Sequence, residues 1–325
     1  MKKHLILSGC LCILLCASCQ KSENMDNDDL SLSMQAMVEG ANLGRTTTTS
    51  AGKTSFVAED AVGFFMPGQQ ENAVKWSYTG SGWNSETPLY WPNQTESFEF
   101  CAFYPYVEEA ERTRIPMPDL STQTGELENL GQFDFLAARC TTNYGAESGV
   151  VAFKGESSFK HIYSLIMVTL KKDAADKTMT LKTMKFEGQN IVASHYYCFD
   201  SEGTDHMQIA DDVVKKDALE LVKEVGIQEE GYSTMVLINP SVLETPLNFS
   251  ITYERDGNSY TATTDKMGTT FESGKIYKYT IRVKKETLEI VGNEITDWVS
   301  GGALEDIFVA VSYTHLRAHE TKANL

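Results

Sequence analysis

Short stretches of alternating apolar and polar residues, each ended by a turn signal, run through most of this chain. One stretch, "SFEFCAFYPY", places Phe98, Phe100, Ala102 and Tyr104 on one face. In another, the turn "RDGN" joins two alternating runs, as in a β-hairpin. A period of two is the pattern of a strand with one buried face. The sequence therefore predicts an all-β fold.

The stretch "FKHIYSLIMVTLKK" opens a second group of predicted strands. Apolar residues occupy both faces at its centre, as expected for a strand buried in a sandwich. With a length of 325 residues, the two groups predict two antiparallel β-sandwich domains, residues 46–156 and 157–311. In residues 211–225 apolar positions recur near helical spacing, so a short helix and a non-helical conformation fit that stretch equally well.

The chain begins like an exported protein. Two lysines precede an apolar run that is too short to span a bilayer permanently, and the small pair Ala17-Ser18 precedes Cys19. This ending resembles the lipobox of bacterial lipoproteins, in which the signal peptide (residues 1–18) is removed and the cysteine is acylated. We expect a lipid anchor at Cys19, and an ordinary signal peptide with an incidental cysteine is the alternative. The acidic residues that follow predict a solvated tether.

Charge and motifs argue against several classes of function. The net charge is −17 and no basic stripe is present, which argues against nucleic acid as a partner. No nucleophile, phosphate-loop or zinc-protease motif occurs, so we expect neither enzymatic activity nor a cofactor. Three widely spaced cysteines predict neither a zinc site nor a disulfide framework and are interpreted as partly buried small hydrophobes: Cys101, Cys140 and Cys198.

Histidines and aromatic residues give only weak indications of a site. His161, His195 and His206 lack the spacing of metal ligands, so no metal site is expected. Four aromatic residues could form a platform for sugar rings, although their strand spacing favours a place in the core: Trp76, Trp83, Trp91 and Tyr104.

The last residues, "VSYTHLRAHETKANL", depart from the strand pattern. They follow neither strand nor helix periodicity and contain two of the six histidines. The string resembles a translated sequencing adapter, so residues 312–325 are given no functional interpretation.

Residues 31–50, "SLSMQAMVEGANLGRTTTTS", join a strand pattern to an isolated basic residue. The apolar positions of the strand alternate with mostly polar neighbours: Leu30, Leu32, Met34, Ala36 and Val38. Arg45 follows Gly44 and opens onto four threonines, a composition typical of an accessible loop. The strand is therefore followed by an isolated arginine at the start of a flexible polar loop.

Three segments resemble the fimbrillin family of Bacteroidota, which comprises the subunits of type V pili and related surface lipoproteins. They are "AEDAVGFFMPG…WSYTGSGWNSETPLYWPNQTESFEFCAFYPY", "FDFLAARC…VAFKGESSFKHIYSLIMVTL" and "FESGKIYKYTIRVKKETLEIVGNEITDW". They carry the family's Asp-x-Val-Gly strand, its Trp-Pro and Tyr-Pro-Tyr steps, its Phe-Lys-His step and its Ile-x-x-Trp ending. Together they cover most of residues 56–300, in the family's order.

The resemblance implies transthyretin-like sandwiches and a pilus subunit. In that family an extracellular arginine-specific protease releases the first strand, and a strand from a neighbouring subunit fills the groove. By this resemblance residues 19–45 form the tether and removable strand, and the bond between Arg45 and Thr46 is cut. The partners are other copies and other fimbrillin-like subunits, and the precursor is lipid-anchored in the outer membrane. The candidate donor strand, "ALEDIFVAV", alternates Ile307, Val309 and Val311.

The alternative is a surface lipoprotein that does not polymerise and binds glycans or a host protein. Arg45 would then be an exposed linker residue, and ring faces such as those of Trp83 and Trp91 should be open to solvent. The resemblance does not separate shaft, anchor, tip and stand-alone roles.

Overall fold

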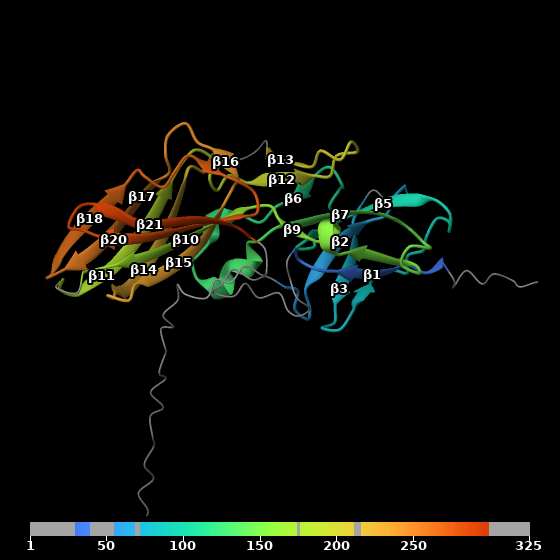
Figure 1. Cartoon of the computed structure of the whole chain (residues 1–325), viewed down its shortest axis with the longest axis horizontal. Coiled ribbons are helices and arrows are strands. Elements are labelled where there is room, and N and C mark those ends of the chain that lie inside the picture. Colours follow the sequence, from blue (N-terminus) through green and yellow to red (C-terminus); the bar gives the residue numbers. More distant parts are fainter. Residues whose placement is uncertain (1–29, 40–54, 69–71, 174–175, 211–215, 299–325) are drawn as a thin grey trace, which may run out of the picture.

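The computed structural model describes residues 30–39, 55–68, 72–173, 176–210 and 216–298 of the chain. Within these ranges nearly all regular structure is β-strand, and most strand pairs are antiparallel. The all-β antiparallel fold predicted from the alternating pattern is therefore confirmed. Figure 1 shows two groups of strands side by side, with the early part of the chain in blue to green and the later part in lime to red.

The first group consists of a larger sheet and a small second layer. The larger sheet has the order β4-β3-β2-β5-β7-β9 and comprises β2 (Ala61–Phe65), β3 (Val74–Tyr78), β4 (Trp83–Ser85), β5 (Ser97–Tyr104), β7 (Leu136–Asn143) and β9 (Lys160–His161). The second layer pairs β1 (Ser33–Ala36) with β8 (Val150–Phe153) in parallel. Between them lies one hydrophobic core, to which β5 contributes the predicted face of Phe98, Phe100, Ala102 and Tyr104.

The second group is a sandwich of two four-stranded sheets. One sheet has the order β15-β10-β20-β21, with β10 (Ser164–Lys171), β15 (Tyr232–Ile238), β20 (Lys275–Val283) and β21 (Leu288–Asp297). The other has the order β14-β11-β17-β18, with β11 (Met179–Glu187), β14 (Ala218–Ile227), β17 (Asn248–Arg255) and β18 (Asn258–Thr264). A short ladder joins β16 (Ser241–Val242) to β19 (Thr270–Phe271).

Two local predictions in this sandwich are confirmed. The turn between β17 and β18 has positive φ angles at Asp256 (53°) and Gly257 (74°), as a type I′ hairpin requires. Strand β10 is buried on both faces, with Leu165 and Ile166 each 0% exposed. Strand β10 lies between β15 and β20 in its sheet, and its buried side chains belong to a core cluster that also includes residues of the opposite sheet, such as Leu181 and Phe249.

The prediction of a short helix in residues 211–225 is wrong for residues 216–225, the part of this stretch that the structure describes. Residues 218–227 form strand β14, and Leu219, Leu221 and Ile227 are buried at a period of two. Val222, one of the residues that suggested helical spacing, is 82% exposed at a bulge in the ladder to β11. The ladder satisfies the backbone and the buried face follows the sheet, so tertiary pairing overrides the near-helical spacing.

The chain passes between the two groups more than once. Strand β6 (Ile115–Pro116) belongs to the first half of the sequence but pairs with β12 (His195–Cys198), which pairs in turn with β13 (His206–Ile209). Arg139 on β7 reinforces this link, because it pairs with Asp205 and donates to the Asp200 carbonyl at 2.7 Å. Short 3₁₀ helices complete the connections: η2 (Leu120–Thr122), η3 (Leu127–Gln132) and η4 (Gly155–Ser157).

Gln123 closes an edge of the second sandwich. Its side-chain oxygen accepts from Leu237 N–H at 2.7 Å, and its side-chain nitrogen donates to the Leu237 carbonyl at 2.8 Å. Leu237 lies on β15, an edge strand of its sheet. The amide group therefore pairs with the edge as a neighbouring strand would, and the edge is protected from pairing with another chain.

The three cysteines of the described chain are free and buried: Cys101, Cys140 and Cys198. Burial raises the pKa of Cys101 to about 12, so this thiol stays protonated at neutral pH. These residues act as small core side chains.

Candidate functional site

Residues 30–39 form an extended segment whose side chains alternate between core and solvent. The inward positions are buried or partly buried: Leu30, Leu32, Met34, Ala36 and Val38. Ser33 and Gln35 between them are exposed. A shift of one residue would turn every inward side chain to solvent, so burial fixes the register of this segment.

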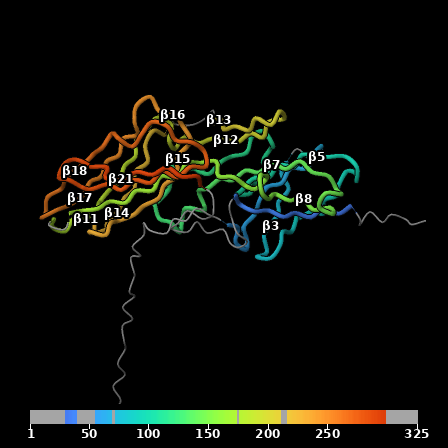
Figure 2. Tube along the Cα trace, in the orientation of Figure 1, coloured from blue at the N-terminus to red at the C-terminus, as the bar shows by residue number. Residues whose placement is uncertain are grey.

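One flank of the segment is the region of β8. Ser33 N–H donates to the Gly149 carbonyl at 3.3 Å, and Met37 N–H donates to the Phe153 carbonyl at 2.9 Å. Further along, Phe159 N–H donates to the Met37 carbonyl at 2.8 Å, and the Phe159 carbonyl accepts from Glu39 N–H at 2.7 Å. Figure 2 shows the blue trace of this segment running alongside β8.

The other flank is a short stretch before the Trp-Pro step. Leu32 N–H donates to the Leu89 carbonyl at 2.8 Å, and Trp91 N–H donates to the Leu30 carbonyl at 2.9 Å. Ser31 and Tyr90 form an antiparallel bridge between these bonds. We call the space that residues 30–39 occupy the strand slot. Its flanks are residues 89–91 on one side and residues 149–153 with Phe159 on the other.

The floor of the strand slot is aromatic. Five rings of the same core cluster are each no more than 2% exposed: Phe64, Trp91, Phe100, Phe153 and Phe159. Phe153 packs edge-on against Phe159 at 5.5 Å between centroids and against Phe64 at 6.2 Å. The slot thus offers what an extended apolar strand needs, namely backbone partners on its flanks and apolar contacts for alternate side chains.

The remaining predicted site residues lie outside the described residues. They are the anchor Cys19, the predicted cleavage site Arg45 and Thr46, and the candidate donor positions Ile307, Val309 and Val311. Glu39 and Ser55 are the described residues on either side of Arg45. In the described part of the chain, no helix is both long enough and apolar enough to cross a membrane.

The aromatic residues considered as a sugar platform are core residues. Trp76 and Trp91 are 3% and 2% exposed. Trp83 and Tyr104 are partly buried, and both contact the ring of Phe56, at 5.0 and 5.8 Å between centroids. Trp76 and Trp91 therefore offer no ring face to a sugar, and Trp83 and Tyr104 are only partly accessible.

The histidines do not form a metal site. Among the described residues, no group of three or more histidine, cysteine or acidic side chains is arranged to hold a metal ion. His161 is buried and lies 2.8 Å from the carboxylate of Asp134. His195 and His206 each place Nδ1 near a backbone carbonyl two residues earlier, at 2.8 and 3.0 Å.

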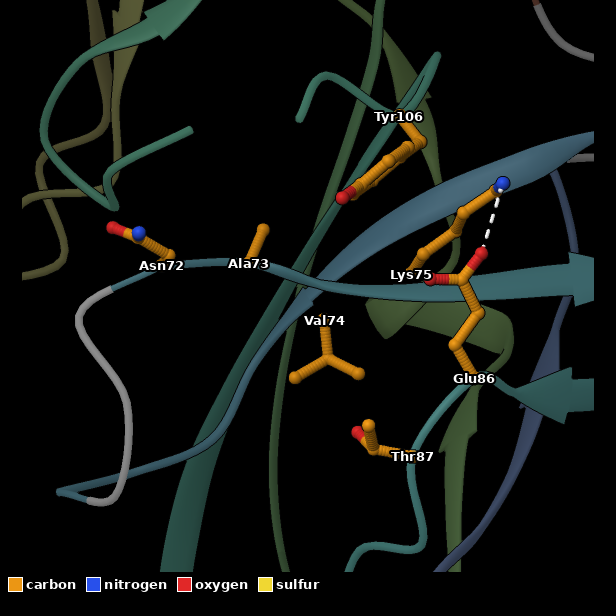
Figure 3. A pocket seen from close by; sticks show the side chains of 7 residues that line it. All are labelled: Asn72, Ala73, Val74, Lys75, Glu86, Thr87 and Tyr106. Carbon is orange, nitrogen blue, oxygen red and sulfur yellow. Dashed lines mark ion pairs between the residues drawn. The ribbon is translucent and has the colours of Figure 1, made fainter. Parts of the chain in front are cut away.

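An open pocket beside β3 has little catalytic potential (Figure 3). Its only cation and its only carboxylate form an ion pair, because Lys75 Nζ lies 3.0 Å from Glu86. Lys75 Nζ also lies 5.6 Å from the centre of the Tyr106 ring. The hydrogen bond to Glu86 raises the pKa of Lys75. The lining holds no histidine, cysteine or second carboxylate: Asn72, Ala73, Val74, Lys75, Glu86, Thr87 and Tyr106.

The Asp-x-Val-Gly step has a structural role at the start of β2. The Asp60 carboxylate accepts from Val57 N–H at 2.7 Å and from the Tyr104 hydroxyl at 3.2 Å. Burial raises the pKa of Asp60 to about 6 despite both hydrogen bonds. A Cβ atom at Gly63 would lie 2.2 Å from the Phe103 ring, so no other residue fits there without a shift.

Sequence reasoning identified the strand in the slot but not its flanks. Trp91 was considered only as part of a sugar platform, and Leu89 and residues 149–153 were not assigned to a site. No local signal marks them, because they are brought to residues 30–39 by long-range pairing.

Comparison with known proteins points to one family. The family model described as fimbrillin-like matches residues 45–298. A protein of Bacteroides uniformis named "Putative fimbrium subunit Fim1C" is 23% identical over 316 residues, which cover 93% of this chain and 97% of that protein.

Two solved structures share the fold. A "putative cell adhesion protein" from Bacteroides uniformis matches with a TM-score of 0.56 and 18% identity, covering 83% of this chain and 99% of that one. A second, from Bacteroides ovatus, matches with a TM-score of 0.53 and 14% identity, covering 83% of this chain and 98% of that one.

Proposed function

Because this chain belongs to the fimbrillin-like family, we propose that it is a structural subunit of a cell-surface pilus that assembles by exchanging one β-strand for another. The observation that carries the proposal is the strand slot. A segment from the beginning of the chain lies between two flanks of the first group, held by backbone bonds and by alternate apolar side chains. A relative named as a fimbrium subunit and a shared fold with cell adhesion proteins support a role in adhesion at the cell surface.

The trigger in this proposal is a cut after Arg45. Arg45 follows the slot segment by six residues and precedes the body of the first group, so the cut separates the strand from the body without breaking a described element. The family match begins at residue 45 and leaves out the slot segment, as expected if the mature subunit lacks it. The protease would be extracellular and arginine-specific.

The burial lost when the first strand leaves is nearly equal to the burial gained when another strand takes its place. Burial of Leu32, Met34 and Val38 contributes about 1.5–3 kcal/mol each before ordering costs, or on the order of 5 kcal/mol in total. The intact precursor therefore keeps its slot filled. After the cut, a strand of similar pattern from another copy or another fimbrillin-like subunit recovers the same burial, and the irreversible cleavage gives the process its direction. The candidate donor positions are Ile307, Val309 and Val311.

The test is limited cleavage of the purified precursor with an arginine-specific protease. We expect a fragment that begins at Thr46 and higher-order species on a native gel. Arg45→Ala should remain intact and monomeric. If the cut wild-type protein stays monomeric, or if Arg45→Ala assembles equally well, the strand-exchange function is refuted.

A matched variant separates the cut from the loss of the arginine. Arg45→Lys is made together with Lys53→Gln, because Lys53 is the other basic residue between residues 39 and 55. It keeps the positive charge at position 45 and resists an arginine-specific protease, but trypsin cleaves after lysine. This variant should therefore assemble after trypsin and not after the arginine-specific enzyme. If this variant assembles without being cleaved, or fails to assemble after trypsin has cut it, position 45 acts in another way.

The anchor is a separate part of the proposal. We propose that the precursor is exported as a lipoprotein and held in the outer membrane through Cys19. Cys19→Ala should release the protein from the membrane fraction and abolish labelling by a fatty-acid analogue. Unchanged labelling in this variant would contradict the anchor while leaving the strand slot untouched.

The alternative of a stand-alone glycan binder lacks support from the rings that suggested it. Such a protein needs tryptophan or tyrosine faces open to solvent. Trp76 and Trp91 are buried in the first core, and Trp83 and Tyr104 pack on Phe56.

A further inference from the structure

Trp91 links the two flanks of the strand slot. Its indole Nε1–H donates to the Gly149 carbonyl at 2.9 Å, in a buried bond that joins residues 58 positions apart in the sequence. Its backbone N–H donates to the Leu30 carbonyl at 2.9 Å. The Gly149 carbonyl accepts a second bond, from Ser33 N–H at 3.3 Å. One side chain thus contacts the opposite flank while its own backbone holds the strand.

The indole bond does not depend on the strand. Both of its ends belong to the body of the first group, and Trp91 is fixed by ring contacts to Phe100 at 5.1 Å and Tyr144 at 6.1 Å. Gly149 is held as well, because its N–H donates to the Tyr144 carbonyl at 2.8 Å. Departure of residues 30–39 therefore leaves this bond in place.

We propose that Trp91 is a positioning residue that keeps the empty strand slot at the width of one strand, ready for an incoming strand. This inference rests on the proposed function and adds a residue to it. A strand bonded on both sides needs flanks about 9.5 Å apart, twice the spacing between neighbouring strands. Without a spacer, flanks above an exposed aromatic floor would close on each other to bury it. The rigid indole ring of Trp91 resists that closure, and its hydrogen bond to the Gly149 carbonyl keeps the two flanks from separating.

Trp76 provides a matched control. It lies in the same core cluster and is 3% exposed, similar to Trp91 at 2%. Among the described residues, its indole N–H has no hydrogen-bond partner. A Trp→Phe change at either position removes the same atoms from the same core, but only the change at Trp91 removes a tie between the flanks.

The experiment uses three full-length proteins: the wild type, Trp91→Phe and Trp76→Phe. Each is cut after Arg45 and mixed with a fluorescent peptide of residues 29–39, and peptide uptake is followed by anisotropy. We expect uptake by Trp91→Phe to be at least tenfold slower or weaker than by Trp76→Phe. The melting temperatures of the two uncut variants should agree within a few degrees, because the covalent strand holds the flanks in both.

The outcomes separate this inference from the function on which it rests. If the wild type takes up no peptide, the proposed strand exchange fails. If the wild type takes up peptide and the two variants do so equally well, strand exchange stands and the role of Trp91 is refuted. If Trp91→Phe does not fold, hydrogen exchange of the Trp91 indole N–H in the wild type tests the role of Trp91 instead. Slow exchange at Trp91 after the cut strand has been removed supports the tie, and fast exchange overturns it.

Discussion

The imidazole ring of His161 lies flat on the indole ring of Trp298, with 3.7 Å between ring centroids and 4° between ring planes. The Asp134 carboxylate lies 2.8 Å from His161 Nδ1, and both side chains are 2% exposed. His161 belongs to β9 of the first sheet, whereas Trp298 directly follows β21 of the second group. The stack therefore joins the first sheet to the end of the last described strand.

Truncation of this stack should be costly. Trp298 is 1% exposed, and Trp298→Ala should lower the free energy of unfolding by about 3–5 kcal/mol because it leaves a large cavity beside the buried side chains of His161 and Asp134. The measurement is urea unfolding followed by near-ultraviolet circular dichroism. Ile295→Ala on the same strand is the control, since Ile295 is 60% exposed and its loss should change stability by no more than about 0.5 kcal/mol. Equal effects of the two changes would contradict a role for the stack in stability.

Asp60 should give the protein a characteristic dependence on pH. The fold raises the pKa of Asp60 from 3.8 to about 6, so the folded state binds this proton more tightly than the unfolded state. The stabilising contribution is complete below about pH 4 and is lost as the pH rises through about 6. Asp60→Asn has no proton to lose. The stability of the variant relative to wild type should therefore increase from pH 4 to pH 7 in urea titrations, and parallel curves would contradict the assignment.

Removal of the Gln123 side chain should expose the edge of β15. Gln123→Ala leaves both Leu237 backbone groups without their buried partners, at a cost of about 2–4 kcal/mol. Amide exchange at Leu237 should also become faster. Gln132→Ala serves as the control, because Gln132 is exposed on η3 and should be replaced without measurable loss. Unchanged exchange at Leu237 in Gln123→Ala would show that the edge is protected in another way.

A charge on the inward face of the slot segment should expel it. Met34 is 5% exposed, so Met34→Asp would bury an unpaired carboxylate and should destabilise the seated strand by about 3 kcal/mol or more. Under the proposed function this precursor self-associates without cleavage, which size-exclusion chromatography can detect. Gln35→Asp introduces the same charge one residue away on the exposed face and should remain monomeric. Identical behaviour of the two variants would contradict the observed register.

The sequence predicted most of what depends on neighbouring residues. The alternation of residues 30–38 identified the inward side chains, and the Asp256-Gly257 turn identified a hairpin, because both follow from local backbone geometry. The same local rules failed in residues 218–225, where pairing with β11 and a bulge at Val222 decide the conformation. They also gave no partner for the slot segment.

By itself, then, the sequence determined that the fold is built of strands, most of their positions and which of their faces are apolar. Only the tertiary structure decided that residues 30–39 lie parallel to β8, that Gln123 covers the edge of β15 and that His161 meets Trp298. The physical reason is that periodicity is set by the backbone over a few residues. Partners are chosen by which distant apolar faces and unpaired backbone groups can be buried together, and many strands of similar pattern compete for each place.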